Sequence, residues 1–326
     1  MRVAWLIPVR NGNPWLGEAV ASALADSLPG DEVVVVDDGS VEDPAQVIPK
    51  DSRVRLIRQP ALGIVAALEH GRRASTAPLL ARLDCDDLVV PGRLVAQRAV
   101  FAADPTVAAV GGMARSITDL GVVPEGMRRY VAWVNGLADP HRELLVESPM
   151  FHPATTLRAS AVAAVGGYRQ GEFPEDYDLF LRLASAGHRL VNVRQEVLAW
   201  RDRPGRLTRT DPRYARPAFV PLKKSWLVAG PLSRPRRVVV WGANKTGRPW
   251  IRWFIDQGHD VPFVVDIAPF VSRHGRPVRP PQALAEASFD LLFVAVGRRG
   301  ARDEIRARIA ELRPELVEGR DWFALS

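Results

Sequence analysis

A run of β-branched residues that ends in two carboxylates is the clearest structural signal in this sequence of 326 residues: EVVVVDDGS, at residues 32–40. Four successive valines are typical of a strand that is buried on both faces of a parallel sheet. The acidic and small residues that follow the valines favour a turn. The segment therefore predicts a buried parallel strand that ends at Asp37 and Asp38.

Strand and helix patterns alternate on both sides of this segment, through residue 200. We expect strands over residues 3–9, 54–57 and 79–83, and helices over residues 14–25 and 64–74. Apolar residues recur at helical spacing in the expected helices and form short continuous runs in the expected strands. The predicted fold class is α/β, with a largely parallel sheet.

A second and smaller α/β unit is expected in the C-terminal part of the chain. Its first strand, at residues 238–241, leads into GANKTG at residues 242–247, which partly matches the glycine pattern of dinucleotide-binding loops. Asn244 replaces the middle glycine, although Asp266 ends the next strand roughly where a ribose-binding acid would lie. We therefore expect a small Rossmann-like domain, and favour docking or oligomerisation over nucleotide binding as its role.

Positive charge is concentrated between the two units. The chain has a net charge of +7, and residues 201–250 carry 13 lysines and arginines against two aspartates. Such a segment can meet phosphates, an anionic membrane or nucleic acid, or it can be a solvated connection. Its arginines alternate with prolines rather than with stacking aromatics, so we expect no nucleic-acid partner. The predicted domains are residues 1–200 and 236–326, joined by a basic Pro- and Arg-rich connection over residues 201–235.

The apolar runs of the sequence are much shorter than the about 20 residues that cross a bilayer. We expect a cytoplasmic protein, with a candidate peripheral contact at the inner face of the membrane. Lys223, Lys224 and Trp226 support this contact, because cations beside an interfacial aromatic suit an anionic leaflet. The alternative is that both lysines solvate a short helix packed between the domains. The single cysteine, Cys85, excludes a disulfide framework.

Three groups of acidic residues fall at the ends of expected strands or at the start of an expected helix. They are Asp37 and Asp38; Asp84, Asp86 and Asp87; and Glu175, Asp176 and Asp178. Ligands of open α/β sheets bind beyond the carboxyl ends of the strands. Carboxylates that converge there repel one another, and Mg²⁺ or Mn²⁺ relieves the repulsion because both prefer oxygen ligands. Each group can also be a capped turn or the first turn of a helix, which acidic residues favour.

Several motifs, in their order along residues 3–201, resemble those of the family 2 glycosyltransferases, which have the GT-A fold. The motifs are IPVRNG at 7–12, VVVDDGS at 34–40, ARLDCDD at 81–87, FHPAT at 151–155 and PEDYDLFLRL at 174–183. The resemblance implies a mixed, mostly parallel sheet that is flanked by helices, and a role in polysaccharide biosynthesis. It also implies inverting transfer of a sugar from a nucleoside diphosphate sugar to a glycan or lipid-linked acceptor, with Mn²⁺ or Mg²⁺ as cofactor.

The resemblance assigns roles to single residues. Those for the donor nucleotide are Pro8, Asn11, Asp38 and Asp84; those for the metal are Asp86 and Asp84; the general base is Asp176; and the candidate acceptor or phosphate contacts are His152, Glu175 and Arg201. Two positions depart from the family pattern. Glu69 stands where many relatives have asparagine, and the Arg-x-His pattern that starts at Arg201 lacks its histidine.

Two other interpretations stay open. A sugar-1-phosphate nucleotidyltransferase has a similar sheet, but it needs a glycine-rich loop with Arg or Lys after the first strand. Residues 8–13 do not supply that loop. The other interpretation is a nucleotide-binding or docking protein centred on residues 236–326, where we also expect any homo-oligomer contact.

Overall fold

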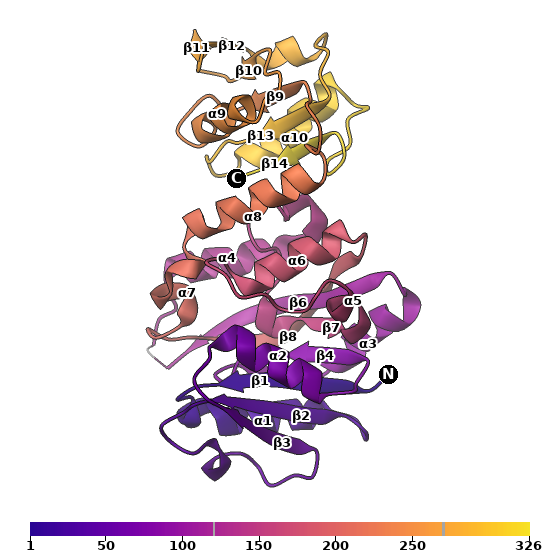
Figure 1. The fold of residues 1–326 in the computed structure, drawn as a ribbon, viewed down its shortest axis with the longest axis vertical. Coiled ribbons are helices and arrows are strands. Elements are labelled where there is room, and N and C mark those ends of the chain that lie inside the picture. The colour runs from indigo at the N-terminus through magenta and orange to yellow at the C-terminus, as the bar shows by residue number, and fades with distance from the viewer. Residues whose placement is uncertain (120, 269–270) are drawn as a thin grey trace. The chain divides into compact units, whose positions relative to one another are not determined.

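The computed structural model describes residues 1–119, 121–268 and 271–326. The chain divides into two compact units, one of Met1–Pro140 with Pro149–Leu222 and the other of His141–Ser148 with Lys223–Ser326 (Figure 1). Each unit has its own sheet and its own apolar core. The division after Leu222 falls inside the predicted connection of residues 201–235.

The first unit contains an eight-stranded sheet in the order β3-β2-β1-β4-β7-β6-β8-β5. Its strands are β1 (Val3–Val9), β2 (Glu32–Asp38), β3 (Val54–Gln59), β4 (Leu79–Arg82), β5 (Leu88–Val89), β6 (Val107–Thr118), β7 (Thr156–Arg158) and β8 (Arg189–Asp202). Strands β1 to β4 run parallel, whereas β7 is antiparallel to both β4 and β6. This arrangement confirms the predicted mixed, mostly parallel sheet.

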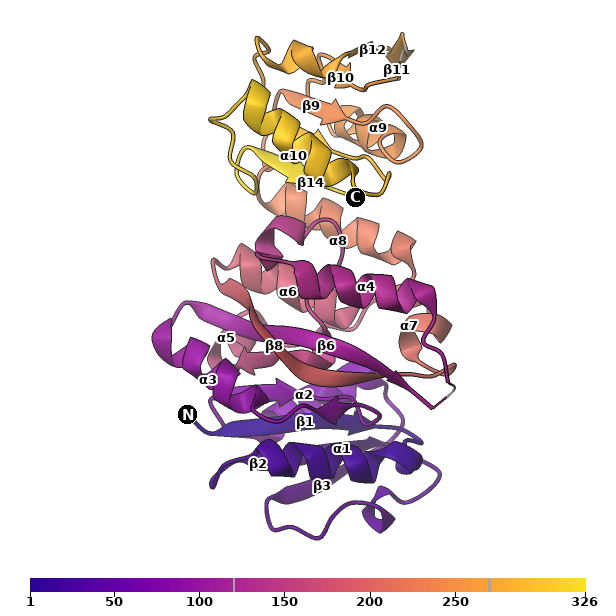
Figure 2. The same ribbon diagram turned by 180° about the vertical axis from the view of Figure 1, so that it is seen from behind.

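Helices cover both faces of this sheet. The helices of this unit are α1 (Asn13–Asp26), α2 (Ile64–Ala74), α3 (Arg93–Ala103), α4 (Glu125–Gly136), α5 (Ala159–Ala164), α6 (Glu175–Ser185) and α7 (Leu207–Thr210), with 3-10 turns η1 (Pro44–Gln46), η3 (His152–Ala154) and η4 (Pro212–Tyr214). The turn η2 (Pro140–Glu143) belongs mostly to the second unit. Helices α2 and α6 lie on one face, and α1, α3 and α4 on the other (Figure 1 and Figure 2). Successive side chains of a strand point to opposite faces of the sheet. Trp5 and Val35 join the apolar cluster that contains α1, whereas Val36 faces α2, where a Cβ on Gly71 would lie 3.1 Å from Val36 Cγ2.

The short helix considered for Lys223 and Lys224 is longer in the structure. Helix α8 runs from Arg216 to Ala229 and contains Pro221. An internal proline interrupts the usual helical pattern, which is why the sequence suggested a shorter helix. Among the described residues, no helix combines the length and apolar character needed to cross a bilayer.

Lys223 and Lys224 do not form the exposed cationic pair expected for a membrane contact. Lys223 is buried, and its Nζ donates hydrogen bonds to Val146 O at 2.8 Å and to Leu325 O at 3.2 Å. Lys224 Nζ lies 5.3 Å from the centre of the Trp253 ring. The expectation that Lys223 meets an anionic leaflet is therefore wrong, because a buried ammonium bonded to carbonyls cannot reach a lipid headgroup.

The second unit contains a six-stranded sheet in the order β11-β12-β10-β9-β13-β14. Its elements are β9 (Val238–Trp241), α9 (Arg248–Asp256), β10 (Val264–Val265), β11 (Ser272–Arg273), β12 (Arg276–Arg279), η5 (Pro281–Leu284), β13 (Leu291–Val294), α10 (Ala301–Leu312) and β14 (Trp322–Ala324). The paired strands are parallel except in the β11–β12 hairpin. Leu292 joins the apolar cluster with α10, whereas the ring of Phe293 stacks on Phe254 of α9 with centroids 4.6 Å apart. A helix therefore covers each face, and the Rossmann-like assignment stays a prediction.

Candidate functional site

The ends of β1 and β2 hold residues that were predicted to bind the donor nucleotide. Pro8 pairs with Val36 near the ends of these strands. Asn11 has a φ of 54°, a left-handed conformation that asparagine adopts more readily than most residues. Asn11 Oδ1 accepts a hydrogen bond from Val41 N at 2.9 Å, and Asn11 N donates to Ser40 Oγ at 2.9 Å. The loops after β1 and β2 are therefore fixed to each other.

Asp38, the last residue of β2, is buried and bonded to the loop before α2. Its carboxylate accepts hydrogen bonds from Gln59 Nε2 at 2.8 Å, Leu62 N at 2.8 Å and Gly63 N at 2.9 Å. These bonds shape the turn into α2, where Gly63 has a φ of 93°. Asp38 thus fixes the loop before α2, and its direct contact with a base or ribose stays a prediction.

Three carboxylates gather in the loop after β4. One oxygen from each of Asp84, Asp86 and Asp87 lies within 4.8 Å of the other two. Asp87 Oδ1 accepts a hydrogen bond from Arg201 N at 2.8 Å, but Asp87 Oδ2 is buried and has no hydrogen-bond partner among the described residues. A buried carboxylate oxygen without a donor is costly unless it takes up a proton or a cation. This oxygen-only set therefore fits a hard divalent cation.

The charges in this loop act against one another. Burial raises the pKa of Asp87 well above its ordinary value, and the charges of Asp84 and Asp86 raise it further. Burial also opposes ionisation of Asp84, but Arg82 and Arg206 outweigh it and leave the pKa of Asp84 lowered. The sequence assigned Asp84 and Asp86 to the metal and left Asp87 out. The position of Asp87 at the end of the same acidic run could have identified it as a third candidate metal ligand.

Two arginines after β8 lie near the acidic loop. Arg203 Nε donates a hydrogen bond to Asp86 Oδ2, and the Arg203 guanidinium carbon lies 4.9 Å from the centre of the Trp15 ring. Arg206 stacks on the Trp200 ring at 3.9 Å. Arg203 stands where the Arg-x-His pattern would have its histidine, yet sequence reasoning gave neither arginine a role. Guanidinium groups at this place suit a diphosphate, which they bind through charge-assisted hydrogen bonds.

Arg201, a predicted phosphate or acceptor contact, is buried behind the acidic loop. Besides its backbone bond to Asp87, its Nε donates to Asp86 O at 2.8 Å. Its terminal nitrogens bond to Asp119 and, at 3.3 Å, to Glu18 Oε2. In this structure Arg201 therefore positions the acidic loop and is held by protein partners.

A second group of side chains surrounds the start of α6. His152 is buried, with Nε2 2.9 Å from the Tyr168 hydroxyl and Nδ1 3.8 Å from Glu175 Oε1. Burial and the nearby charge of Arg82 hold the pKa of His152 well below its ordinary value, so the ring is neutral at pH 7. The Tyr214 hydroxyl donates to Glu175 Oε2 at 2.6 Å. Burial leaves the pKa of Glu175 raised despite this bond.

Asp176 and Asp178 differ although they share the first turn of α6. Burial, then the charge of Glu175, raise the pKa of Asp176 to about 8. Asp178 is buried and bonded by Arg169 and Arg182, with Arg182 Nη2 at 2.7 Å. Asp178 is therefore a structural partner of two arginines, whereas Asp176 is poised to exchange a proton near neutral pH.

Glu69, which departs from the family pattern, anchors the turn before α6. Its Oε1 accepts hydrogen bonds from Tyr168 N at 2.8 Å and from Arg72 Nε at 2.8 Å. A Cβ on Gly167, whose φ is 72°, would lie only 2.3 Å from Glu69 Oε1. Glu69 thus holds in place the segment that carries Tyr168, the partner of His152.

The structure brings two of the predicted groups together around Arg82. Arg82 Nη2 donates to Asp84 Oδ1 at 2.5 Å, and its charge also acts on the pKa values of Asp176 and Glu175. The acidic loop and the candidate base therefore belong to one electrostatic site. Such a site can hold a cation with its anionic ligand and can accept a proton beside them.

Comparisons with known proteins identify the family and the fold that this chain resembles. A family described as "Glycosyl transferase family 2" matches residues 4–165. A similar relative, the amylovoran biosynthesis glycosyltransferase AmsE of Erwinia amylovora, is 28% identical over 183 residues, which are 55% of this chain and 67% of AmsE.

Two solved structures share the fold at low identity. TarS 1–349 of S. aureus in complex with UDP-GlcNAc has a TM-score of 0.55 at 15% identity, over 70% of this chain and 66% of TarS 1–349. The mannosyltransferase PcManGT of Pyrobaculum calidifontis, in complex with GDP-Man and Mn²⁺, has a TM-score of 0.52 at 19% identity, over 78% of this chain and 83% of PcManGT. The likeness confirms the predicted GT-A fold class. The chain spans about two thirds of the length of both AmsE and TarS 1–349.

Proposed function

Because residues 4–165 form a glycosyl transferase family 2 domain, the protein is a glycosyltransferase, and we propose that it takes its sugar from a nucleoside diphosphate sugar. The acceptor would be a hydroxyl group of a glycan or of a lipid-linked sugar, and the reaction would invert the anomeric carbon. The relative AmsE acts in amylovoran biosynthesis, which supports a polysaccharide as the product class.

One observation carries the donor assignment. The buried, unpartnered Oδ2 of Asp87 lies in a set of three carboxylates whose oxygens are within 4.8 Å of one another. Asp84, Asp86 and Asp87 would hold a divalent cation, Mn²⁺ or Mg²⁺, and the ion would neutralise charge on the leaving diphosphate. The complexes of TarS with UDP-GlcNAc and of PcManGT with GDP-Man and Mn²⁺ support a nucleotide sugar and a metal at such a site.

Other side chains of the first unit would bind the nucleotide and the diphosphate and would orient the acceptor. Pro8, Asn11 and the Asp38 loop would receive the base and ribose at the ends of β1 and β2. Arg203 lies against the acidic loop and would bind a diphosphate oxygen. His152 and Glu175 would orient the acceptor beside Asp176.

Asp176 would act as the general base. It would take the acceptor proton onto its carboxylate while the acceptor oxygen bonds to the anomeric carbon and the bond from that carbon to the diphosphate breaks. A single displacement from the face opposite the leaving group gives inversion. The raised pKa of Asp176, about 8, suits a base that must hold this proton.

A transfer assay tests the proposal. The full chain is incubated with a panel of UDP-, GDP- and dTDP-sugars, Mn²⁺ and candidate glycan acceptors, and release of the nucleoside diphosphate is measured. We expect release with at least one donor, loss of release in Asp176→Asn, and retention in Glu172→Gln, which changes an exposed acid near α6. Equal release by Asp176→Asn and wild type would overturn the assignment of the base.

A further inference from the structure

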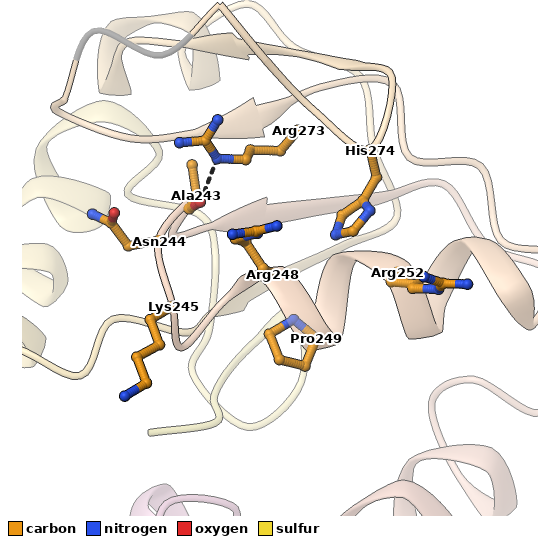
Figure 3. A pocket seen from close by; sticks show the side chains of 8 residues that line it. All are labelled: Ala243, Asn244, Lys245, Arg248, Pro249, Arg252, Arg273 and His274. Carbon is orange, nitrogen blue, oxygen red and sulfur yellow. Dashed lines mark hydrogen bonds between the residues drawn. The ribbon is translucent and has the colours of Figure 1, made fainter.

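The second unit contains a cleft whose lining residues have no part in the proposed transfer. The cleft has a volume of about 570 Å³, within the range of small-molecule sites. Figure 3 shows its lining, which comes from the loop after β9, from α9 and from the β11–β12 hairpin. The lining residues are Ala243, Asn244, Lys245, Arg248, Pro249, Arg252, Arg273 and His274.

The lining is cationic and contains no carboxylate. Lys245, Arg248, Arg252 and Arg273 supply positive charge, and His274 adds an imidazole. Arg252 lies 3.6 Å from Asp256 of its own helix, and Arg273 Nε donates to Ala243 O at 2.8 Å, as the dashed line in Figure 3 marks. Within the described part of the chain, no acidic side chain pairs with Lys245 or Arg248. Two cations of the lining, Lys245 and Arg248, are therefore available to an anion.

The cleft lies where the strand order of this sheet reverses. Strand β9 pairs with β10 on one side and with β13 on the other, and all three run parallel. The chain leaves β9 through α9 to β10 and returns later to β13. The loop after β9 therefore lies at a topological switch point, the place where open α/β sheets bind ligands.

The loop between β9 and α9 is built for close packing. Gly242 has a φ of +130°, and a Cβ there would lie 2.4 Å from Ala295 O. A Cβ on Gly247 would lie 1.8 Å from Gly242 O. Asp266 Oδ2 accepts a hydrogen bond from Ala243 N at 2.7 Å and so holds the loop from the end of β10. Arg248 and Pro249 then start α9, whose N-terminal end also favours negative charge.

We propose that this cleft binds the phosphate groups of a phosphorylated small molecule of nucleotide size, separately from the donor site of the first unit. Phosphate matches the lining because guanidinium groups bind its oxygens with paired, charge-assisted hydrogen bonds. Asp266 is already bonded to Ala243 N and Ala268 N, and Asn244 stands at the place of the middle glycine. The cleft therefore recognises its ligand through phosphate, not through the ribose-binding acid of a standard dinucleotide site.

Calorimetric titration of the full chain tests the proposal. The probes are inorganic pyrophosphate, ADP and UDP, all in EDTA so that metal-dependent binding in the first unit is silent. The test variant is Arg248→Glu, and the matched control is Arg234→Glu, an exposed arginine outside the cleft with the same charge change. Asp86→Ala removes a carboxylate of the donor site, and thermal melting verifies that each variant folds.

We expect every probe to bind wild type, with at least about tenfold weaker binding to Arg248→Glu, the loss that follows from one charged hydrogen bond. Arg234→Glu and Asp86→Ala should bind like wild type. Tighter binding of ADP or UDP than of pyrophosphate would add a nucleoside contact to the phosphate site. Three results would overturn the proposal: no binding by wild type, equal loss in both arginine variants, or loss in Asp86→Ala. The transfer assay is an independent readout, so either proposal can fail while the other stands.

Discussion

If Asp176 is the general base, as proposed, its ionisation predicts a defined pH dependence for the reaction. A general base must be unprotonated, and burial together with Glu175 raises the pKa of Asp176 to about 8. About one eleventh of the base is then ionised at pH 7 and about ten elevenths at pH 9, so kcat/KM should rise about tenfold between them. Replacing Glu175 with glutamine removes the second cause of the shift and should move the midpoint to lower pH.

The Asp176→Asn variant separates chemistry from folding. Transfer should fall by ~10²–10⁴-fold, the usual contribution of a general base, and the rise with pH should disappear. The folded protein holds the Asp176 proton more tightly than the unfolded chain does. The free energy of unfolding that this proton contributes is therefore lost as the pH rises from the ordinary pKa of the carboxyl group, 3.8, to its folded-state pKa of about 8. The amide side chain of the variant carries no such proton, so above pH 8 the variant should melt at a higher temperature than wild type.

The assay is initial-rate nucleoside diphosphate release between pH 6 and 9.5 with a saturating acceptor, alongside thermal melting at each pH. A flat wild-type profile, or an Asp176→Asn variant that keeps more than about a tenth of the rate, would refute the reasoning. An inactive variant that also melts earlier at every pH would instead assign Asp176 a structural role.

Three further changes have expected outcomes. Glu69→Ala removes the acceptor that holds the turn before α6, and denaturant unfolding should show that the free energy of unfolding falls by ~1–3 kcal/mol. An unchanged free energy of unfolding would mean that the turn does not depend on Glu69. Lys223→Met removes the buried ammonium that donates to Val146 O and Leu325 O and should lower the melting temperature clearly, whereas Lys224→Met should not. Equal effects would contradict the burial of Lys223. Arg203→Ala frees Asp86 from a competing cation, so calorimetry should show tighter Mn²⁺ binding and weaker diphosphate binding; two unchanged affinities would remove Arg203 from the site.

The local pattern of the sequence was enough to predict the parallel strands β1 to β4 of the first unit. The valines of β2 form a buried strand that ends at Asp38, and the expected strand over residues 3–9 matches β1. Both features depend on neighbours in the chain, and local periodicity reports such features well. The acidic loop after β4 was predicted for the same reason, since Asp84 and Asp86 follow the end of that strand.

The hydrogen-bond partners of the site could not be predicted, because they lie far apart in the chain. Arg201 N reaches Asp87 across 114 positions, and Tyr168 N reaches Glu69 across 99. No periodicity reports such pairs. The pKa of Asp176 was equally hidden, because it depends on how deeply the fold buries the carboxyl group. The first turns of α8, before Pro221, could not be predicted either, because an internal proline usually marks a helix end.

Metal-dependent binding of the donor nucleotide is the central claim, and one titration tests it most directly. UDP and GDP are titrated into the full chain with Mn²⁺ and with EDTA, for wild type, Asp86→Ala and the control Asp104→Ala, which removes an acid from the end of α3. We predict that wild type and Asp104→Ala bind at least one diphosphate much more tightly with Mn²⁺, and that Asp86→Ala loses this gain. Diphosphate affinity that is the same with and without Mn²⁺, or a gain that survives in Asp86→Ala, would contradict the assignment of the acidic loop.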